Sequence, residues 1–317
     1  MIKIFADWLT YSVFNIAPKT LLAEAVDFFI YDTIKIFLLL IIIIFIVSII
    51  RSFLPQEKIR KILSSEKKYF GNVLASLLGI ITPFCTCSAV PLFLGFLEAG
   101  VPLGTTFSFL VASPMINEVA LVLLFGMFGW KIAFLYIFSG LAISILSGII
   151  IGKLKVENLL EDLALKNVQS QNQEISEISW KRRLNYAKNY TLHIIKKVWV
   201  YIIIGIGIGA WIHGYVPTDF LATYASADKW YAVPLAVIIG IQLYSNAAGV
   251  IPLVGVLTEK GVSIGTSLAF MMAVTGLSLP EFMILRKVMK LKLILIFAGI
   301  VAIGIIFTGY LFNLVLR

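Results

Sequence analysis

Two cysteines in an apolar segment are the residues of this chain best suited to chemistry. Cys85 and Cys87 lie two positions apart in segment 79–91, beside the hydroxyl side chains of Thr86 and Ser88. Thiolates bind soft, thiophilic centres, so the two thiols could bind one soft ligand together. Side chains at i and i+2 share one side of an extended strand but not of a helix. Both sulfurs therefore reach one ligand only where segment 84–88 is unwound.

Two prolines predict where that unwinding occurs. Pro83 and Pro91 lack an amide hydrogen and push Thr82 and Val90 away from helical geometry. Non-helical backbone at membrane depth is tolerated only where it is buried in protein or lines a cavity. We therefore predict that residues 84–89 are unwound between two half-helices and form the floor of a substrate site.

Polar residues in other apolar segments complete the predicted site. An acidic group inside a membrane span is a functional hypothesis by default, so Glu118 could carry a proton, or it could accept backbone hydrogen bonds at the start of the next helix. Asn117 and Asn246 could line the cavity or satisfy broken backbone. For Glu281, nearer a basic end, we expect a helix cap or a salt bridge. The predicted substrate-binding residues are Cys85, Thr86, Cys87, Ser88, Asn117, Glu118, Ser245 and Asn246.

Composition predicts the fold class. Hydrophobic residues make up 60% of the 317 residues and charged residues 14%, and the mean hydropathy is +0.98. Several apolar runs exceed the ~20 residues that span a bilayer. We predict an all-α polytopic membrane protein. The net charge of +9 comes from basic loops beside apolar spans, which is the positive-inside pattern and not a nucleic-acid footprint.

The chain divides into two transmembrane halves. We predict an extracytoplasmic segment 1–27, a first half 28–152, a cytoplasmic linker 153–191 and a second half 192–317. The basic loop 51–68 marks the cytoplasmic side, so both termini lie outside the inner (cytoplasmic) membrane. Residues 71–98 are expected to cross as one broken span. Segments 102–129 and 262–289 are short pairs that are either re-entrant or fully spanning.

The halves also share sequence. Segment 91–112 aligns without a gap to 252–273, with nine identities in 22 positions that begin at Pro91 and Pro252. One half starts outside and the other inside, so the copies are expected to be inverted. Inverted repeats with discontinuous helices are typical of transporters whose site lies at the repeat interface near the midplane. In this alignment Cys85 falls opposite Asn246.

The segment from Thr82 to Ser88 (TPFCTCS) with Pro91, and the turn with Ser113-Pro114 and Asn117-Glu118, resemble a predicted-permease family whose characterised members export trivalent organoarsenicals. The similarity covers roughly residues 30–315. It implies an efflux permease that works by alternating access, with Cys85 and Cys87 as candidate arsenic ligands. It does not settle the substrate.

Several alternatives stay open. The protein could be a carrier or channel for another small sulfur-containing solute or ion, with the cysteines near the path, or a membrane thiol oxidoreductase. The cysteines could also be buried packing residues. We see no phosphate loop and no serine-histidine-acid set, and so predict no enzyme and no cofactor. The expected partners are a small-molecule substrate and membrane lipid, without nucleic acid; homo-oligomerisation and proton coupling are left open.

Overall fold

The structure is a computed structural model that describes residues 2–17, 20–53, 63, 69–82, 86–161, 180–215, 229–243, 247–259, 261–286 and 288–316. Over these residues the elements are helices, and the one strand-like feature among them is an isolated bridge between Leu160 and Met289. The predicted all-α class is confirmed.

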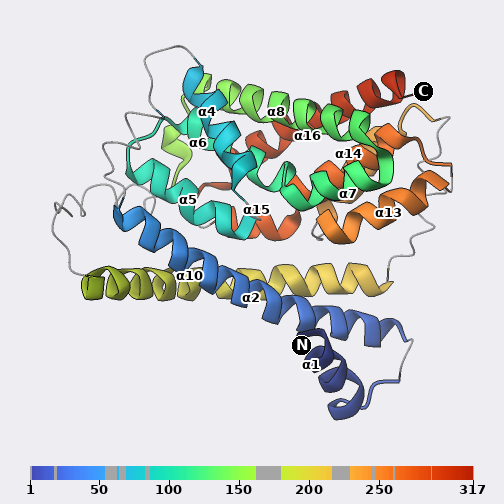
Figure 1. The fold of residues 1–317 in the computed structure, drawn as a ribbon, viewed down its shortest axis with the longest axis horizontal. Coiled ribbons are helices and arrows are strands. Elements are labelled where there is room, and N and C mark those ends of the chain that lie inside the picture. The colour runs from blue at the N-terminus through green and yellow to red at the C-terminus, as the bar shows by residue number, and fades with distance from the viewer. Residues whose placement is uncertain are drawn as a thin grey trace.

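Each half contains two long helices and a set of shorter ones (Figure 1). An N-terminal arm, α1 (Ile2–Asp7) and the π-helix η1 (Trp8–Val13), packs on the start of α2. The first half comprises α2 (Leu21–Phe53), α4 (Phe70–Ile81), α5 (Thr86–Glu98), α6 (Leu103–Met115), α7 (Glu118–Phe128) and α8 (Trp130–Lys153). The second comprises α10 (Trp180–Tyr215), α12 (Ala232–Gln242), α13 (Ala247–Glu259), α14 (Ile264–Gly276), α15 (Leu279–Leu285) and α16 (Leu291–Val315). A short 3-10 helix, η2 (Glu157–Leu159), follows α8.

The order of elements repeats at the offset that aligns Pro91 with Pro252 in the sequence. Helices α5, α6, α7 and α8 begin at Thr86, Leu103, Glu118 and Trp130, and their counterparts α13, α14, α15 and α16 begin at Ala247, Ile264, Leu279 and Leu291. The spacing between each helix start and its counterpart is the same in all four pairs. The two halves are therefore built on the same plan of helices.

Close helix packing repeats at the same positions. A Cβ built on Gly79 would lie 2.9 Å from the Cβ of Ala112, and a Cβ on Gly240 would lie 2.9 Å from the Cβ of Ala273. Both members of the first pair align with those of the second at the offset of the repeat. Glycine and alanine let the backbones of α4 and α6, and of α12 and α14, approach closely.

Helices α4 and α5 both pack on α6 and run in opposite directions. Gly71 lies beside Thr105, and Gly79 beside Ala112, so α4 and α6 run in the same direction. Only residues 99–102 join the end of α5 to the start of α6, so α5 returns along α6 towards the level at which α4 begins. The prediction that 71–98 crosses as one broken span is therefore wrong, because small residues hold α4 parallel to α6.

Helices α6 and α7 instead form one bent path. Their axes change direction by 48° at a break around Ile116 and Asn117, which is a bend and not a reversal. Over the described residues, three helices are long and apolar enough to cross a membrane, or up to four with this bent pair: 130–153, 264–285, 291–315, and 103–115 with 120–128. The crossing predicted for 71–98 is lost, and α6 with α7 supplies one crossing in its place. The linker is therefore still predicted to lie on the cytoplasmic side.

Corresponding helices of the two halves run in opposite directions. Gly148 near the end of α8 packs on Gly104 of α6. The ring centroid of Phe297, near the start of α16, lies 5.5 Å from that of Phe107 in α6. Helices α8 and α16 are thus antiparallel where they cross, as Figure 1 shows. Inversion of the halves across a membrane requires this relation, and the inversion itself stays a prediction.

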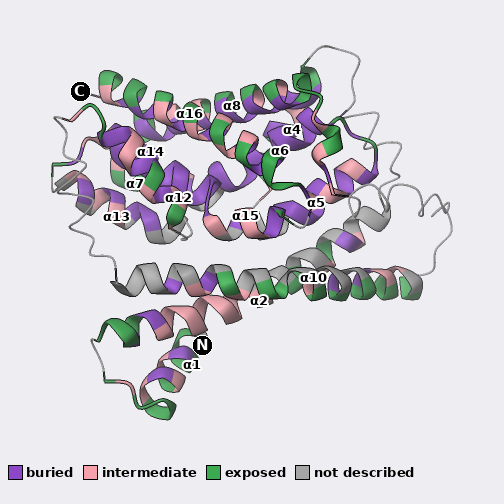
Figure 2. Cartoon of the chain, turned by 180° about the vertical axis from the view of Figure 1, so that it is seen from behind, coloured by how far each residue is buried: buried purple, intermediate pink, exposed green. Residues whose placement is uncertain are grey.

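The central helices of the bundle are α6 and α14. Every residue of α6, and every residue of α14 after Ile264, is buried. The exposed residues of α8 and α16 lie on their outer faces (Figure 2). Helices α6 and α14 meet end to end, so the core is continuous between the halves.

Candidate substrate site

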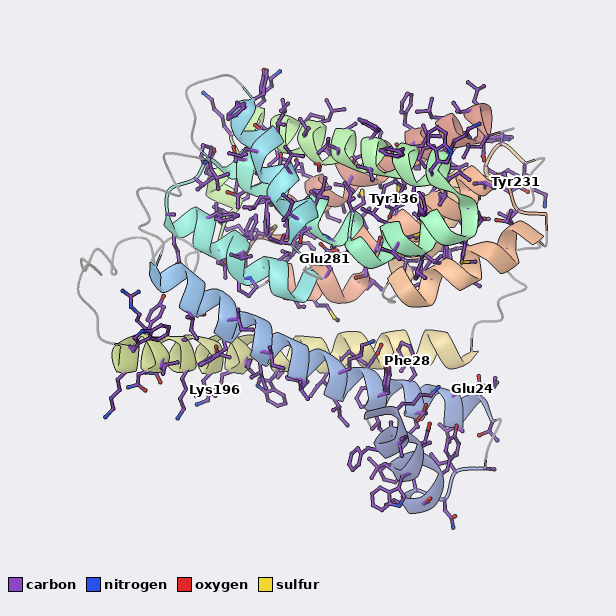
Figure 3. The ribbon with its side chains drawn as sticks, in the orientation of Figure 1. Glu24, Phe28, Tyr136, Lys196, Tyr231 and Glu281 are labelled. Carbon is purple, nitrogen blue, oxygen red and sulfur yellow. The ribbon has the colours of Figure 1, made fainter. Side chains whose placement is uncertain are left out.

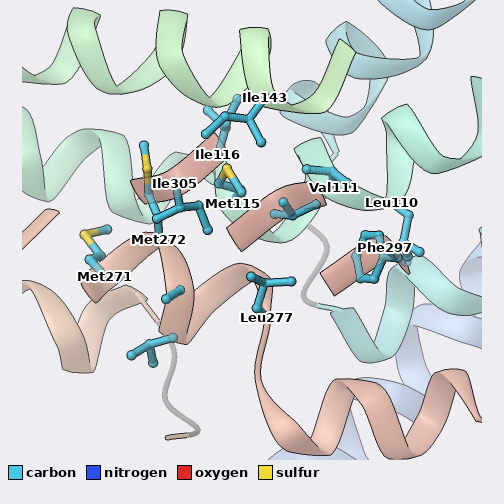
Figure 4. Packing of buried hydrophobic residues seen from close by; sticks show 14 of the residues in the cluster. Leu110, Val111, Met115, Ile116, Ile143, Met271, Met272, Leu277, Phe297 and Ile305 are labelled. Atoms are coloured by element: carbon cyan, nitrogen blue, oxygen red, sulfur yellow. The ribbon is translucent and has the colours of Figure 1, made fainter. Parts of the chain in front are cut away.

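The short helices α5, α7, α13 and α15 all begin close to one contact, that between Met115 and Gly276. A Cβ on Gly276 would lie 3.2 Å from the Cε of Met115, and α7 and α15 begin three positions after Met115 and Gly276. Helices α5 and α13 follow α4 and α12, whose Gly79 and Gly240 pack one turn earlier on α6 and α14. Figure 4 shows Met115, Ile116 and Leu277 in this region.

This convergence gives the centre of the molecule a distinct electrostatic character. The first N–H groups of an α-helix have no partner within the helix, and they carry a positive partial charge. The ends of α4, α6, α12 and α14 and the starts of the helices that follow them all lie here. The centre is therefore a place where a polar or anionic group can be accepted inside an apolar bundle.

The cysteine motif follows α4 in the chain and extends into the first turn of α5. Thr82 ends α4 in an extended conformation, and its Oγ1 donates to the carbonyl oxygen of Leu78 over 2.9 Å. Cys85 lies outside the described residues. The backbone of Thr86, Cys87 and Ser88 is helical in the first turn of α5, while their side chains lie outside the described part of the chain.

Two expectations for this segment are corrected. Residues 86–89 belong to α5, so they are not unwound as predicted, because the helix already begins at Thr86. Pro91 lies inside α5 and does not end it. A membrane helix tolerates proline because local adjustments satisfy the freed carbonyl. Of segment 84–88, residues 86–88 are therefore helical, and residues 84 and 85 lie outside the described part of the chain.

The second predicted polar pair lies at the bend between α6 and α7. Asn117 is the N-cap of α7, and its Oδ1 accepts a hydrogen bond from the N–H of Ala120 at 2.7 Å. This is the backbone-satisfying role that the sequence left open for it. Glu118 is the first residue of α7, and its side chain lies outside the described part. Ser245 and Asn246 also lie outside the described residues.

A tyrosine from α8 supports the same bend. The hydroxyl of Tyr136 is fully buried and donates to the carbonyl oxygen of Met115 over 2.7 Å. That carbonyl belongs to the last turn of α6, where no amide of the same helix can pair with it. Sequence analysis missed Tyr136, because its partner is a backbone atom of another helix and leaves no mark in the residue types.

Hydroxyl and amide side chains hold α4, α6 and α8 together. Asn72 Nδ2 donates to Ser108 Oγ at 3.0 Å, and Ser144 Oγ donates to Ser76 Oγ at 3.0 Å. Such bonds stabilise helix contacts in lipid, where an unmet polar group is costly. These bonds fix the position of α4, the helix that precedes the cysteine motif, relative to α6 and α8.

Glu281 is the buried acid of the centre. Its side chain is 1% exposed and lies in the first turn of α15. The helix cap or salt bridge expected for it stays a prediction. Within the described residues, no group of three or more histidine, cysteine or acidic residues could hold a metal ion.

Comparison with known proteins identifies the family of this chain. A family model described as "Predicted permease" matches residues 21–314. The chain belongs to this predicted-permease family. It is a multi-pass membrane protein of a transporter family rather than of an enzyme family.

Similar proteins occur in distant organisms. The permease is 24% identical over 309 residues to the UPF0718 protein MJ0584 of Methanocaldococcus jannaschii. This alignment covers 80% of this chain and 85% of that protein. It is 27% identical over 264 residues to a putative two-component membrane permease complex subunit of Streptococcus mutans, covering 80% and 79%. It is 23% identical over 265 residues to the UPF0718 protein YraQ of Escherichia coli, covering 83% and 73%. No solved structure matches.

Proposed function

We propose that this permease exports a small thiophilic solute, with singly methylated trivalent arsenicals as the substrate, by alternating access of two inverted halves. The observation that carries the proposal is the position of the C-x-C motif. Cys87 lies in the first turn of α5, and α5 begins near the contact of Met115 with Gly276, as do α7, α13 and α15. A thiol pair at this centre fits a substrate site between the halves.

The chemistry of binding balances without an additional reactant. A singly methylated trivalent arsenical carries two hydroxyls, and each As–S bond that forms releases one hydroxyl, which leaves as water with the proton of the thiol. Two thiols, Cys85 and Cys87, therefore give two As–S bonds and two waters. The proposal requires that the first turn of α5, which holds Cys87, unwinds when the arsenical binds, so that both sulfurs face one side. Release on the other side is the reverse exchange, with water or an external thiol as the incoming group.

The sidedness follows from the basic loops. Loop 51–68 and linker 153–191 carry the clustered basic residues, and such loops stay in the cytoplasm. The proposal therefore has both termini outside the inner membrane and the linker inside. The antiparallel course of α8 and α16 supports the inversion of the halves.

The test uses the fact that Cys85 and Cys87 are the only cysteines of the chain. Cells that depend on this protein are exposed to methylarsonous acid, with wild type, the single serine variants and Cys85→Ser/Cys87→Ser. We expect the double variant to lose resistance. We also expect the arsenical to protect purified wild-type protein from thiol alkylation. Gly126→Ala, at a glycine with no neighbour within 4 Å, is the control for expression. Unchanged resistance in the double variant would show that the thiols are not ligands.

A second candidate, transport of a small sulfur-containing anion, is favoured by the convergent helix starts. The N-termini of α5, α7 and α13 present partial positive charge to the centre. Uptake of sulfite, thiosulfate and methylarsonous acid into everted vesicles separates the two candidates. Transport of the anions alone, unaffected by Cys85→Ser/Cys87→Ser, would favour the anion carrier.

A further inference from the structure

Glu281 occupies an unusual place for a carboxyl group. It is 1% exposed and lies on α15, which packs against α5 on one side and α10 on another. Figure 3 shows Glu281 within the main bundle, in the layer that faces the α2–α10 pair. The helix that carries Cys87 and the helix that carries Glu281 therefore contact each other, from opposite halves of the chain.

The repeat indicates that the fold does not require this carboxyl. The equivalent position in the first half is Ala120, the third residue of α7 as Glu281 is the third of α15, and it is also 1% exposed. There the helix start is satisfied by Asn117, which accepts from the N–H of Ala120. The same architecture thus forms with a methyl group at this place, where Asn117 caps the helix. In α15 the equivalent N-cap, Ser278, makes no side-chain cap hydrogen bond, so the two halves differ in polar chemistry at this helix start.

A carboxyl in such a position links its proton to the conformation around it. Burial of a carboxyl group favours its neutral form, while access to water favours the carboxylate. If the halves rock about the central contact of Met115 and Gly276, water reaches the centre from one side at a time. A group that binds its proton in one arrangement and releases it in the other biases the equilibrium between them.

The surrounding titratable groups are few on the bundle side. Helix α5 carries Cys87 and Glu98, and α14 carries none. Helix α10 carries two histidines, His193 and His213, four tyrosines, and six lysines and arginines between positions 181 and 197. Arg286, at the end of α15, is paired with Glu161 at 2.8 Å.

We propose that Glu281 is the proton-carrying residue of this permease: one proton moves inward through its carboxyl as substrate moves outward. This assignment rests on the proposed transport function and adds the coupling ion to it. It gives the second half of the repeat a role distinct from that of the first, which carries the thiols.

The experiment uses the full-length protein in liposomes with methylarsonous acid as the probe. Exchange of labelled probe at equal pH measures binding and rocking, and accumulation into vesicles with an acidic lumen measures proton coupling. A pH-sensitive dye in the lumen follows the protons. We expect Glu281→Gln to retain exchange but to lose accumulation and proton release by at least about tenfold. Glu281→Asp should retain part of both. Glu98→Gln, which neutralises another buried acid, should retain both fully.

The outcomes separate the two proposals. If wild type does not exchange the probe, the proposed substrate is wrong, and the coupling assignment falls with it. If wild type accumulates the probe and Glu281→Gln does so equally, Glu281 is not the coupling residue although the transport function stands. Loss of exchange in Glu281→Gln together with a lowered unfolding temperature would assign the carboxyl a structural role, and would also overturn the coupling proposal.

Discussion

Arg286 donates from Nη1 to Oε1 of Glu161 over 2.8 Å, and this pair joins the chain leaving α8 to the turn between α15 and α16. Backbone bonds accompany it: the N–H of Glu161 donates to Val288 at 2.9 Å, and the N–H of Lys290 donates to Leu159 at 2.8 Å. The first residues of the linker are thus attached to the second half of the protein.

The ion pair itself should contribute little to stability. The two side chains are 47% and 34% exposed, and exposed pairs are worth about 0–1 kcal/mol and are weakened by salt. We expect a double-mutant cycle of Arg286→Ala and Glu161→Ala to give a coupling free energy in this range, measured by thermal unfolding in detergent. A coupling energy above about 2 kcal/mol would show that the pair is shielded from solvent.

Gly148 should be intolerant of any side chain. Its Cβ would overlap Ser108 Oγ and the carbonyl oxygen of Gly104, and would lie 2.9 Å from Asn72 Nδ2. Because a backbone atom is among these neighbours, α6 and α8 would have to separate. We expect Gly148→Ala to lower the free energy of unfolding by about 1–3 kcal/mol, measured by thermal unfolding.

The control for Gly148 is a glycine in open space. Nothing lies within 4 Å of a Cβ on Gly126 in α7 or on Gly299 in α16. Alanine there should be neutral or should stabilise the helix by up to about 1 kcal/mol. Equal destabilisation at Gly126 and Gly148 would mean that helix contact does not explain the effect.

Tyr136→Phe should loosen the bend between α6 and α7. The change removes a buried donor and leaves the Met115 carbonyl without this bond, which costs about 1–3 kcal/mol. The equivalent position in the second half is Phe297, also fully buried, so the ring itself fits such a site. We expect lower hydrogen-exchange protection at residues 115–120. Protection equal to wild type would mean that the bend is held by Asn117 alone.

The N-terminal arm should pack most firmly at acid pH. Burial and the nearby charge of Asp7 raise the pKa of Asp27 above its ordinary value of 3.8, although Lys3 opposes the shift. The packed state therefore holds the proton more tightly than the free state, and the packing contribution falls as pH rises from 3.8 through the raised pKa. We expect hydrogen-exchange protection of residues 2–13 to fall over that window, and Asp27→Asn to abolish the fall. Protection that increases with pH would contradict this assignment.

Much of the fold could be predicted because it depends on composition and local pattern. The apolar runs require helices, since backbone polar groups in lipid must be satisfied within the segment. Identities such as Phe109 with Phe270 and Ala112 with Ala273 reveal the repeat, and the same residues meet Gly79 and Gly240 in the structure.

The course of the chain through each break could not be predicted in this way. Pro83 marks an interruption after α4, but proline chemistry does not say whether the next helix continues or returns. Pro91 lies inside α5 and Pro114 inside α6, so a proline does not even ensure a break. The contact of Gly79 with Ala112, on a helix distant in sequence, decides that α5 returns.

By itself, the sequence determined an all-helical membrane protein of two related halves with a thiol pair at an interruption, because these properties follow from hydropathy, repetition and residue type. Only the tertiary structure decided that α4 and α5 run in opposite directions while α6 and α7 continue, and that Glu281 is buried where Ala120 is its counterpart. These features depend on contacts between helices distant in sequence, and burial of a single side chain is a property of its neighbours.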